Sequence, residues 1–530
     1  MSEWKILLFS FIFPTIFSEP SQLKFLMNSP DEDLVSSSSH TPRVVADSFR
    51  QGPNVYAALS SSDPSNTKPP LSTKANFYDS QGEHDAVPWL LHECNVIVFT
   101  FSGKPVYTRY GSEDLIAGFT GTLQALVSKF SSVGFTSGED NLRCISIGST
   151  RMEFLNKSPL ILVCVSRHAR VPRLALQRLL AAVHSQLTFV LTSGVNKTLE
   201  MRPNFDIRSL LGGTKALLGN LISWMHRDML LCIRDCAVEP LPLPVDTRTS
   251  ISNVLQQKVP ACTLLSVLLS GHRLVATSAP PDAQPLISAA DLVLLINLVV
   301  SSSSMRAAQS WTPVCLPSLS SEAFVYGYVQ YLSSEVVHVA ISASPDNENF
   351  YAMSKHGEFL RAFFASTTDL ETVAEWDLKC PLTVSGVPEL DGGSERREAL
   401  SRVRHCAIVL NQSKQIFSSR IIPGPETECM QKGTDKFKNV FRNYQQCLEL
   451  LWATPSPSQQ VSVTSGNDFV FVWTTSEFQF FLTAPRGVDV SVVTHVYQWM
   501  REHEQTLFLS NIATTGASGT RLNTKAPSLW

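Results

Sequence analysis

Residues 91–130 read LHECNVIVFTFSGKPVYTRYGSEDLIAGFTGTLQALVSKF, and this stretch decides the fold. The run at 92–101 is apolar and rich in β-forming residues, which predicts a strand. The SGKP sequence at 102–105 predicts a tight turn, and the alternating residues 104–110 predict a second strand. An amphipathic helix is then expected from Ser112 to Phe130, because apolar residues recur there at helical spacing.

Two glycines interrupt the apolar stripe of this expected helix. The stripe comprises Leu115, Phe119, Leu126 and Phe130, with Leu123 and Val127 beside it. Gly118 and Gly121 lie on adjacent turns, and each costs ~1 kcal/mol relative to alanine in a helix. We expect the close approach of another backbone to compensate for this cost, as in a tightly packed helix pair.

The remainder of the first folded region predicts three strands and two helices. The strands are expected at 142–147, 151–155 and 160–166, and the last is apolar on both faces, as a central strand is. The helices are expected at 172–191 and 205–225, the second capped by Asn204 or Asp206 and weakened in its middle by Gly212 and Gly213. Antiparallel hairpins interrupted by a helix predict an α+β sheet with helices on its faces.

The same order of elements recurs twice, which indicates an internal repeat of domains. We therefore expect three domains, at 88–240, 250–368 and 402–511, followed by a flexible tail at 512–530. The helix expected at 285–300 is apolar nearly all round, so it should be buried between layers or against a neighbour.

The segments that flank the domains have their own signals. Residues 241–244 read LPLP, which is typical of a stiff linker. Residues 1–87 contain a polar stretch rich in Ser, Pro, Asp and Asn that cannot bury enough apolar surface to fold, so we expect a disordered arm. The apolar run at 4–17 is too short to span a bilayer, and residues 1–26 are interpreted as an over-extended start or a signal-like segment.

Composition limits the classes of function. The chain has 530 residues, 44% hydrophobic and 17% charged, with a formal net charge of -3, which excludes a global basic field for nucleic acid or anionic membranes. The low charge indicates either surfaces covered by a partner or large cores. The 11 cysteines are scattered and odd in number, as expected for free thiols in a reducing compartment. Cys232 and Cys236 lack a second pair at zinc spacing, so we expect no metal.

No catalytic motif is found in the sequence. The SGKP sequence is not a phosphate-binding loop, and the signatures of dinucleotide binding, zinc proteases and serine hydrolases are missing. His92 and Glu93 are interpreted as solvated residues at a strand edge. Arg167, Arg170 and Arg173 form a basic cluster that suits lipid headgroups, an acidic partner or a solvated loop. We therefore expect a binding or assembly protein without catalytic residues or cofactor.

Four segments resemble one known family. They are SGKPVYTRYGSEDLIAGFTGTLQALVS at 102–128, RPNFDIRSLLGGTKALL at 202–218, LLSGHRLVATSAP at 268–280 and SWTPVCLPSLSSEAFVYGYVQYL at 310–332. In this order and spacing they resemble the SAND, or monensin-sensitivity, family of vacuolar fusion proteins. The third region is similar in position and plan, with weaker motifs.

This resemblance implies a fold and a function. It implies three longin domains and a heterodimer with a second three-longin protein, of the calcium-caffeine-zinc sensitivity family. The pair would be a non-enzymatic guanine-nucleotide exchange factor for the late-endosomal Rab-seven GTPase. The Rab-five GTPase and phosphatidylinositol 3-phosphate would recruit it from the cytoplasm to endosome and vacuole membranes, where it would drive early-to-late endosome conversion, vacuole fusion and autophagy.

The resemblance also implies where the contacts should lie. The first domains of the two subunits would pair through the helix at 112–130, with Gly118 and Gly121 allowing close approach. The residues expected near the GTPase or partner are Lys104, Tyr107, Arg109, Tyr110 and Glu113. For Tyr107 and Tyr110, packing beneath the helix is the alternative.

Two other functions fit the sequence. One is a trafficking adaptor or coat scaffold of longin type without exchange activity. The other is a secreted or lumenal protein, which would apply if residues 4–17 form a signal peptide.

Overall fold

The computed structural model describes eleven segments of the chain and one isolated residue. These are residues 89, 92–132, 142–167, 171–202, 205–212, 214–227, 237–279, 287–307, 309–373, 400–419, 435–452 and 458–509. The expected disordered arm (1–87) and flexible tail (512–530) lie outside them, as do Arg170, Gly213, Cys232 and Cys236.

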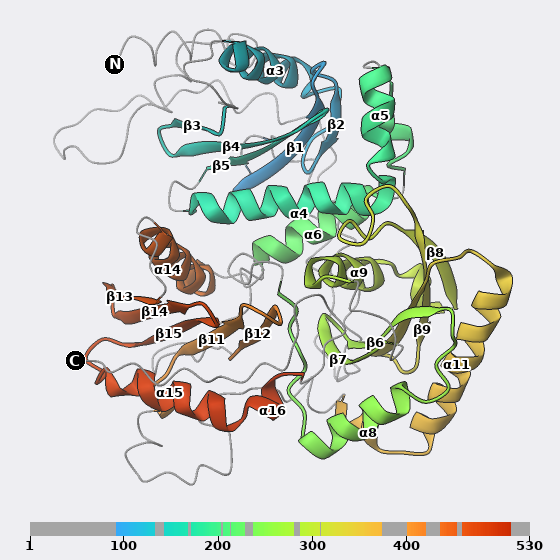
Figure 1. Ribbon diagram of the computed structural model, residues 1–530. Helices are drawn as coiled ribbons and strands as arrows, with labels where there is room; N and C mark the ends of the chain where they lie inside the picture. The colour runs from blue at the N-terminus through green and yellow to red at the C-terminus, as the bar shows by residue number, and fades with distance from the viewer. Residues whose placement is uncertain are drawn as a thin grey trace, which may run out of the picture. The chain divides into compact units, whose positions relative to one another are not determined.

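The described part of the chain contains three five-stranded antiparallel sheets, and each has the same strand order (Figure 1). In every sheet the first two strands form a hairpin, and the last strand returns to pair with the first. The predicted α+β class and the threefold repeat are therefore confirmed.

The first domain has the sheet order β2-β1-β5-β4-β3. Its strands are β1 (Cys94–Thr100), β2 (Pro105–Thr108), β3 (Cys144–Ile147), β4 (Thr150–Lys157) and β5 (Leu160–Ser166). Its helices are α3 (Ala117–Ser132), α4 (Arg173–Leu191), α5 (Gly194–Met201), the 3-10 turn η4 (Ile207–Ser209) and α6 (Lys215–Arg227). Helix α3 covers one face of the sheet and α4 covers the other (Figure 1).

The second domain repeats this plan with the order β7-β6-β10-β9-β8. Its strands are β6 (Thr263–Ser270), β7 (Arg273–Ser278), β8 (Ser310–Val314), β9 (Val325–Tyr331) and β10 (Val336–Ser342). Its helices are α8 (Val245–Leu255), α9 (Ala289–Ser301), α10 (Ser304–Ala307) and α11 (Asn347–Ala365). Helix α9 occupies the position that α3 has in the first domain, between the second and third strands.

The third domain has the order β12-β11-β15-β14-β13. Its strands are β11 (His405–Leu410), β12 (Gln415–Ser418), β13 (Ser458–Ser465), β14 (Asp468–Thr475) and β15 (Phe478–Pro485). Its helices are α14 (Asp435–Trp452), α15 (Ser491–Glu502) and α16 (Glu504–Leu507). Helix α14 is the counterpart of α3 and α9.

Two predicted helices differ from the structure. The first begins at Ala117 instead of Ser112, because residues 113–116 form turns in which the Ser112 hydroxyl accepts a hydrogen bond from the Leu115 amide at 3.3 Å. The second, expected at 205–225, is divided into η4 and α6. Asp206 caps η4, since its side chain accepts a hydrogen bond from the Arg208 amide. Gly212 lies at the break, consistent with the weak middle expected there.

The expected stiff linker is instead a buried connection. Val238 pairs with Gln415 of β12, and Pro240 pairs with Leu274 of β7, both in parallel. Leu241 and Leu243 are fully buried, so the segment 237–243 covers the outer edges of two sheets at once. Unpaired sheet edges promote aggregation, and this segment protects two of them. Helix α8 packs on β7, so the second domain begins before residue 250.

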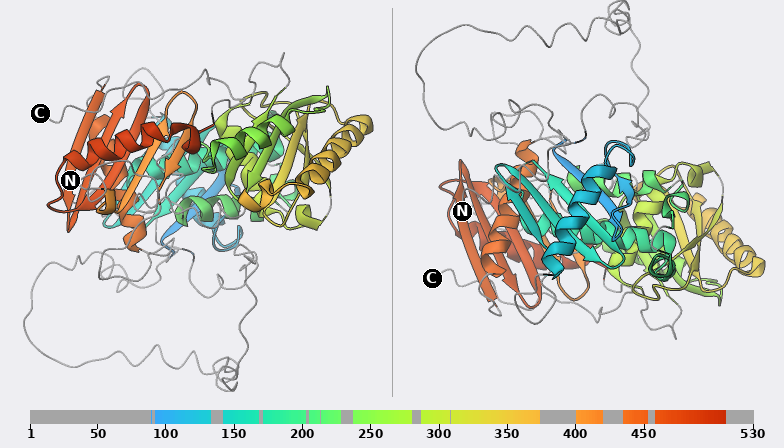
Figure 2. Two further views of the ribbon diagram at one scale, coloured as in Figure 1. Left: turned by 90° about the horizontal axis from the view of Figure 1, so that it is seen from below. Right: turned by 90° about the horizontal axis from the view of Figure 1, so that it is seen from above.

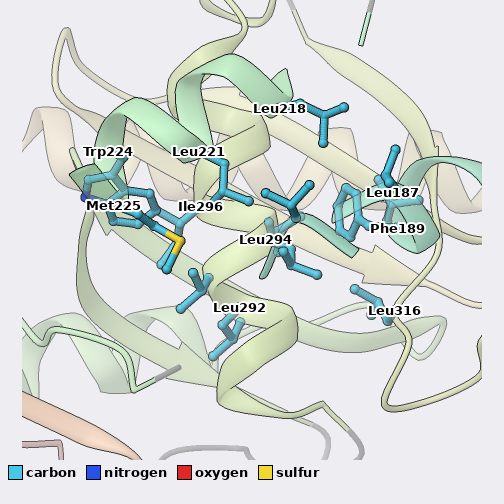
Figure 3. Close-up of a cluster of buried hydrophobic side chains, with 14 of the residues drawn as sticks. Leu187, Phe189, Leu218, Leu221, Trp224, Met225, Leu292, Leu294, Ile296 and Leu316 are labelled. Atoms are coloured by element: carbon cyan, nitrogen blue, oxygen red, sulfur yellow. The ribbon is translucent and has the colours of Figure 1, made fainter. Parts of the chain in front are cut away.

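Helices α4, α6 and α9 join the first two domains in one hydrophobic core (Figure 3). Labelled members from these helices include Leu187 of α4, Leu221 of α6 and Ile296 of α9. The buried Asn297 amide donates to Gln186 Oε1 at 2.9 Å and to the Leu217 carbonyl at 3.2 Å. The prediction that the apolar helix at 285–300 is buried against a neighbour is thus confirmed. The large shared core also explains part of the low content of charged residues in the chain, 17%.

Helix α4 is the one described helix long and apolar enough to cross a membrane. Its buried residues include Leu176, Leu180 and Val183, and it packs between the first sheet and α6. Its apolar composition is therefore explained by its place in the core of the first domain.

Candidate partner-binding surface

The hairpin of β1 and β2 holds α3 through two glycines. Gly103, in the turn of the hairpin, has a φ of +81°, a conformation that favours glycine. A Cβ atom at Gly103 would lie 3.3 Å from the Gly121 Cα atom, and the Thr120 hydroxyl donates to the Gly103 carbonyl at 2.8 Å. The close backbone approach predicted for Gly121 is therefore present, but within the first domain.

Helix α3 buries a different stripe from the predicted one. Its sheet-facing side consists of Phe119, Leu123 and Val127, preceded by Ile116. Leu115 and Phe130 are exposed, at 66% and 49% of their surface. Of the predicted stripe, Phe119 is buried and Leu126 is half-buried, and Leu115 lies in the turn before the helix. The prediction that Leu115 and Phe130 belong to the buried stripe was therefore wrong.

The outer face of α3 carries small residues between large apolar ones. Ala117, Gly118 and Ala125 are exposed, and Gly121 is half-buried. A Cβ atom at Gly118 would meet nothing within 4 Å. We call this face, from Leu115 to Phe130, the α3 surface. Its small residues allow a second backbone to approach closely, and the exposed Leu115 and Phe130 lie at the two ends of the stretch, the latter beside exposed Ser128 and Lys129. Viewed from above, α3 crosses the outer side of the first sheet (Figure 2, right).

The two counterparts of α3 are covered by other domains of the same chain. Helix α9 packs against α6 and α4, and α14 packs against α4. The Leu174 amide at the start of α4 donates to Glu449 of α14. Among the described segments, α3 is thus the member of this helix set whose outer face has no equivalent cover.

Two of the residues predicted near the partner pack against α6. Tyr107 is buried, at 2% exposure, and burial raises the pKa of its phenol. The Arg109 Nη2 atom donates to Ser223 Oγ at 2.6 Å, and a Cβ atom at Gly219 would collide with the Arg109 guanidinium. Glycine at 219 therefore gives the guanidinium room to lie against α6. Arg109 also lies over the ring of Tyr110, with 5.4 Å from Cζ to the ring centroid.

The other predicted residues make ion pairs and a ring stack. Lys104 Nζ lies 3.3 Å from Asp206 Oδ2, and Lys215 Nζ lies 2.5 Å from Glu113 Oε1. Tyr110 stacks on His92, with ring centroids 3.6 Å apart.

These ion pairs fasten the segment after α5 to the hairpin. Arg208 extends the network because it contacts both Asp206 and Asp114. The Arg208 guanidinium, followed by Lys104, holds the pKa of Asp206 well below its usual range. The structure therefore brings Lys104 and Glu113 together with the start of the α3 surface as one charged border.

The basic cluster is partly neutralised. Arg173, the first residue of α4, makes a two-pronged contact with Glu153 at 3.1 and 3.3 Å. Glu153 is fully buried and also accepts from Gln177 at 2.7 Å. Arg167 is half-buried after β5, and its amide donates to the Glu93 carbonyl. The charge of Arg173 is therefore neutralised by Glu153 within the first domain.

Sequence reasoning missed a charged junction between the first and third domains. Glu93 Oε1 accepts from Arg442 at 2.9 Å, and Glu93 Oε2 lies 2.9 Å from Lys438 Nζ and 3.0 Å from His226 Nε2. Lys438 and Arg442 belong to α14, and His226 belongs to α6. The expected solvated strand edge was wrong for Glu93. No local signal could have shown this, because its α14 partners are more than 340 residues away in sequence.

The described residues offer no cluster for a metal ion. Within these segments, no group of three or more His, Cys, Asp or Glu side chains is arranged to bind one. In the described segments, the candidate site therefore consists of the α3 surface and its charged border, without a metal centre.

The shared sheet order and helix positions define a chain of longin domains. The family model described as "First Longin domain of FUZ, MON1 and HPS1" matches residues 94–221, and the model of the second longin domain of the same proteins matches residues 262–361. A relative that is 31% identical over 79% of this chain shows that the chain belongs to the MON1/SAND family.

Relatives from distant organisms match most of the chain. "Protein SAND" of Takifugu rubripes is 31% identical over 430 residues, which are 79% of this chain and 77% of the relative. "Vacuolar fusion protein MON1 homolog A" of Gallus gallus is 29% identical over 79% of this chain and 73% of the relative. "Vacuolar fusion protein MON1 homolog" of Arabidopsis thaliana is 26% identical over 81% of this chain and 71% of the relative.

Proposed function

We propose that this chain is one subunit of a heterodimeric guanine-nucleotide exchange factor that acts in vacuole fusion. Its partner would be a second three-longin protein, of the calcium-caffeine-zinc sensitivity family, and its target the late-endosomal Rab-seven GTPase. The name of its relatives, vacuolar fusion protein, supports the trafficking role. The observation that carries the proposal is the α3 surface, which is exposed while α9 and α14 are covered.

The composition of the α3 surface suits a helix or sheet from another protein. Small residues at a helix crossing reduce the distance between the two axes, which packing of larger side chains would increase. Leu115 and Phe130 can each bury apolar area worth about 1.5–3 kcal/mol when fully covered. The α3 surface therefore has both a close-contact centre and apolar anchors, as central parts of interfaces do.

Exchange requires no covalent chemistry from this chain. A partner surface that binds the switch segments of a GTPase can disturb the magnesium and phosphate contacts that hold the nucleotide. It promotes release only to the extent that it binds the nucleotide-free state more tightly than the loaded state. In our proposal the charged border at Lys104 and Glu113 lies beside this contact. Rab-five and phosphatidylinositol 3-phosphate would recruit the heterodimer from the cytoplasm to the endosome or vacuole.

The pairing can be tested with Gly118→Leu. Leucine favours a helix over glycine by about 0.8–1 kcal/mol, so the variant should keep α3 folded while filling the space between the small residues. We expect the partner to be lost from co-purification with the full chain. Lys355→Leu is the matched control, because it adds the same side chain to an exposed site on α11 of the second domain. A normal yield of heterodimer from Gly118→Leu would refute pairing through α3.

Nucleotide release tests the exchange activity separately. The reconstituted heterodimer should accelerate release of a fluorescent nucleotide from Rab-seven, and Gly118→Leu should abolish the acceleration. A stable heterodimer that leaves the release rate unchanged would reject the exchange factor and support a longin-type adaptor or coat scaffold.

A further inference from the structure

Two cysteine thiols face each other across the centre of the first sheet. The Sγ atoms of Cys94 in β1 and Cys164 in β5 lie 3.2 Å apart. The strands are antiparallel, and the register pairs Cys94 with Ser166 and Val96 with Cys164. The two cysteines are thus offset by two residues, which places their side chains on the same face of the sheet.

This arrangement is close to that of a disulfide. A disulfide needs an S–S distance of about 2.05 Å, so the two sulfur atoms must approach by about 1.2 Å. Because the two cysteines are diagonal neighbours, closing the bond requires side-chain rotation together with a small shift of the two strands. Neither cysteine is part of a disulfide in the structure.

Cys94 is the more accessible thiol of the pair. Cys94 is half-buried and borders a cavity of about 30 Å³ that Glu93, His226 and Arg442 also line. A cavity of this size holds a molecule as small as water. Cys164 is fully buried behind Cys94, so the pair has one accessible and one enclosed thiol.

We propose that Cys94 and Cys164 form a modification site, at which peroxide converts the two thiols into a disulfide. The Cys94 sulfur attacks one oxygen of hydrogen peroxide, the O–O bond breaks, and Cys94 sulfenic acid and water are formed. The Cys164 sulfur then attacks the Cys94 sulfur, the S–O bond breaks, and the departing hydroxide leaves as water with the Cys164 proton. Two electrons pass from the thiols to the peroxide, which becomes two molecules of water.

Peptide mapping of the full chain tests this site. The purified protein is treated with hydrogen peroxide, alkylated and digested with trypsin, which places Cys94 and Cys164 in separate peptides. We expect a linked pair of peptides that has lost two hydrogens and that a dithiol reductant separates. Cys94→Ser and Cys164→Ser should each abolish the link.

Two variants make the outcome specific. Cys144→Ser is the matched control and should keep the link, because Cys144 belongs to β3 and its sulfur contacts the Ser146 hydroxyl, at 3.7 Å. In Cys164→Ser, Cys94 should accumulate as sulfenic acid that a dimedone probe captures. Full alkylation of both thiols after peroxide, or oxidation of Cys94 to sulfinic acid in the unmodified chain without a link, would overturn the proposal.

Discussion

The charged junction between the first and third domains should be a large source of stability. We consider Glu93→Gln, which keeps the size of the side chain but removes its charge. Glu93 holds two cations of α14, Lys438 and Arg442, whose side chains are 9% and 10% exposed. The variant leaves both cations nearly buried without their carboxylate.

The magnitude follows from burial. Removing one partner of a fully buried ion pair costs about 3–5 kcal/mol, mainly because a charge remains buried and uncompensated. Glu93 itself is 26% exposed, so water recovers part of this loss. We therefore expect Glu93→Gln to lower the free energy of unfolding by about 2–3 kcal/mol.

Urea unfolding followed by tryptophan fluorescence measures this change, since Trp224 of α6 and Trp473 of the third domain are buried reporters. The matched control is Glu322→Gln, which removes an exposed pair with Lys197 at 2.8 Å and should leave the midpoint unchanged. Adding Lys438→Met to Glu93→Gln should cost less than the sum of the two single changes. A Glu93→Gln midpoint equal to that of the unmodified chain would refute the reasoning.

Three further predictions follow from named contacts. The His226 ring and the Lys438 ammonium hold the pKa of Glu93 below its usual range. The stability that the Glu93 carboxylate contributes is therefore present above about pH 4.3, and it is lost as the pH falls towards the lower pKa of the folded state. In an acid titration, the free energies of unfolding of Glu93→Gln and the unmodified chain should converge. Asn297→Leu should cost about 1–3 kcal/mol in thermal unfolding because the Gln186 amide loses its buried partner, and a loss no smaller in the Gln186→Leu double variant would contradict this explanation. Gly103→Ala should lower the free energy of thermal unfolding by about 1–2 kcal/mol, because its φ is positive and its Cβ atom would contact α3. Gly466→Ala, at a φ of +60° but with open space around the Cβ atom, should lower it by less in the same measurement.

The fold could be predicted from the sequence because each of its elements has a recognisable pattern of residues within a short window. Each hairpin, helix and returning strand carries its own periodicity, and the threefold recurrence indicated the repeat. The errors occur where contacts with elements distant in the sequence determine the local structure. The LPLP linker reads as exposed, yet it pairs with β7 and β12. The helix at 205–225 reads as continuous, yet Gly212 lies where η4 ends before α6.

The candidate site was predictable in place but not in detail. The pattern correctly located an amphipathic helix that contains Gly118 and Gly121. It could not show that Tyr107 and Arg109 turn towards α6, because their partners lie more than 100 residues further along the chain. Nor could it show that α3 begins at Ala117, after the turn at 113–116, or that Phe130 is exposed. Contacts between distant elements leave no signal in a short window of sequence.

The three equivalent helices explain why one surface remains for a partner. Helix α9 is apolar nearly all round, and α6 and α4 bury its outer side. Helix α14 is strongly amphipathic, and its Lys438 and Arg442 bind Glu93 of the first domain. Within the described residues, helix α3 is covered on one side by its own sheet, and its exposed side carries Ala117, Gly118 and Ala125. Its outer residues are small, with exposed Leu115 and Phe130, and such a face gains free energy only when another backbone approaches it closely. Among the described segments, α4 and α6 pack against α9, and α4 packs against α14, so in our proposal the backbone that covers α3 comes from a second protein.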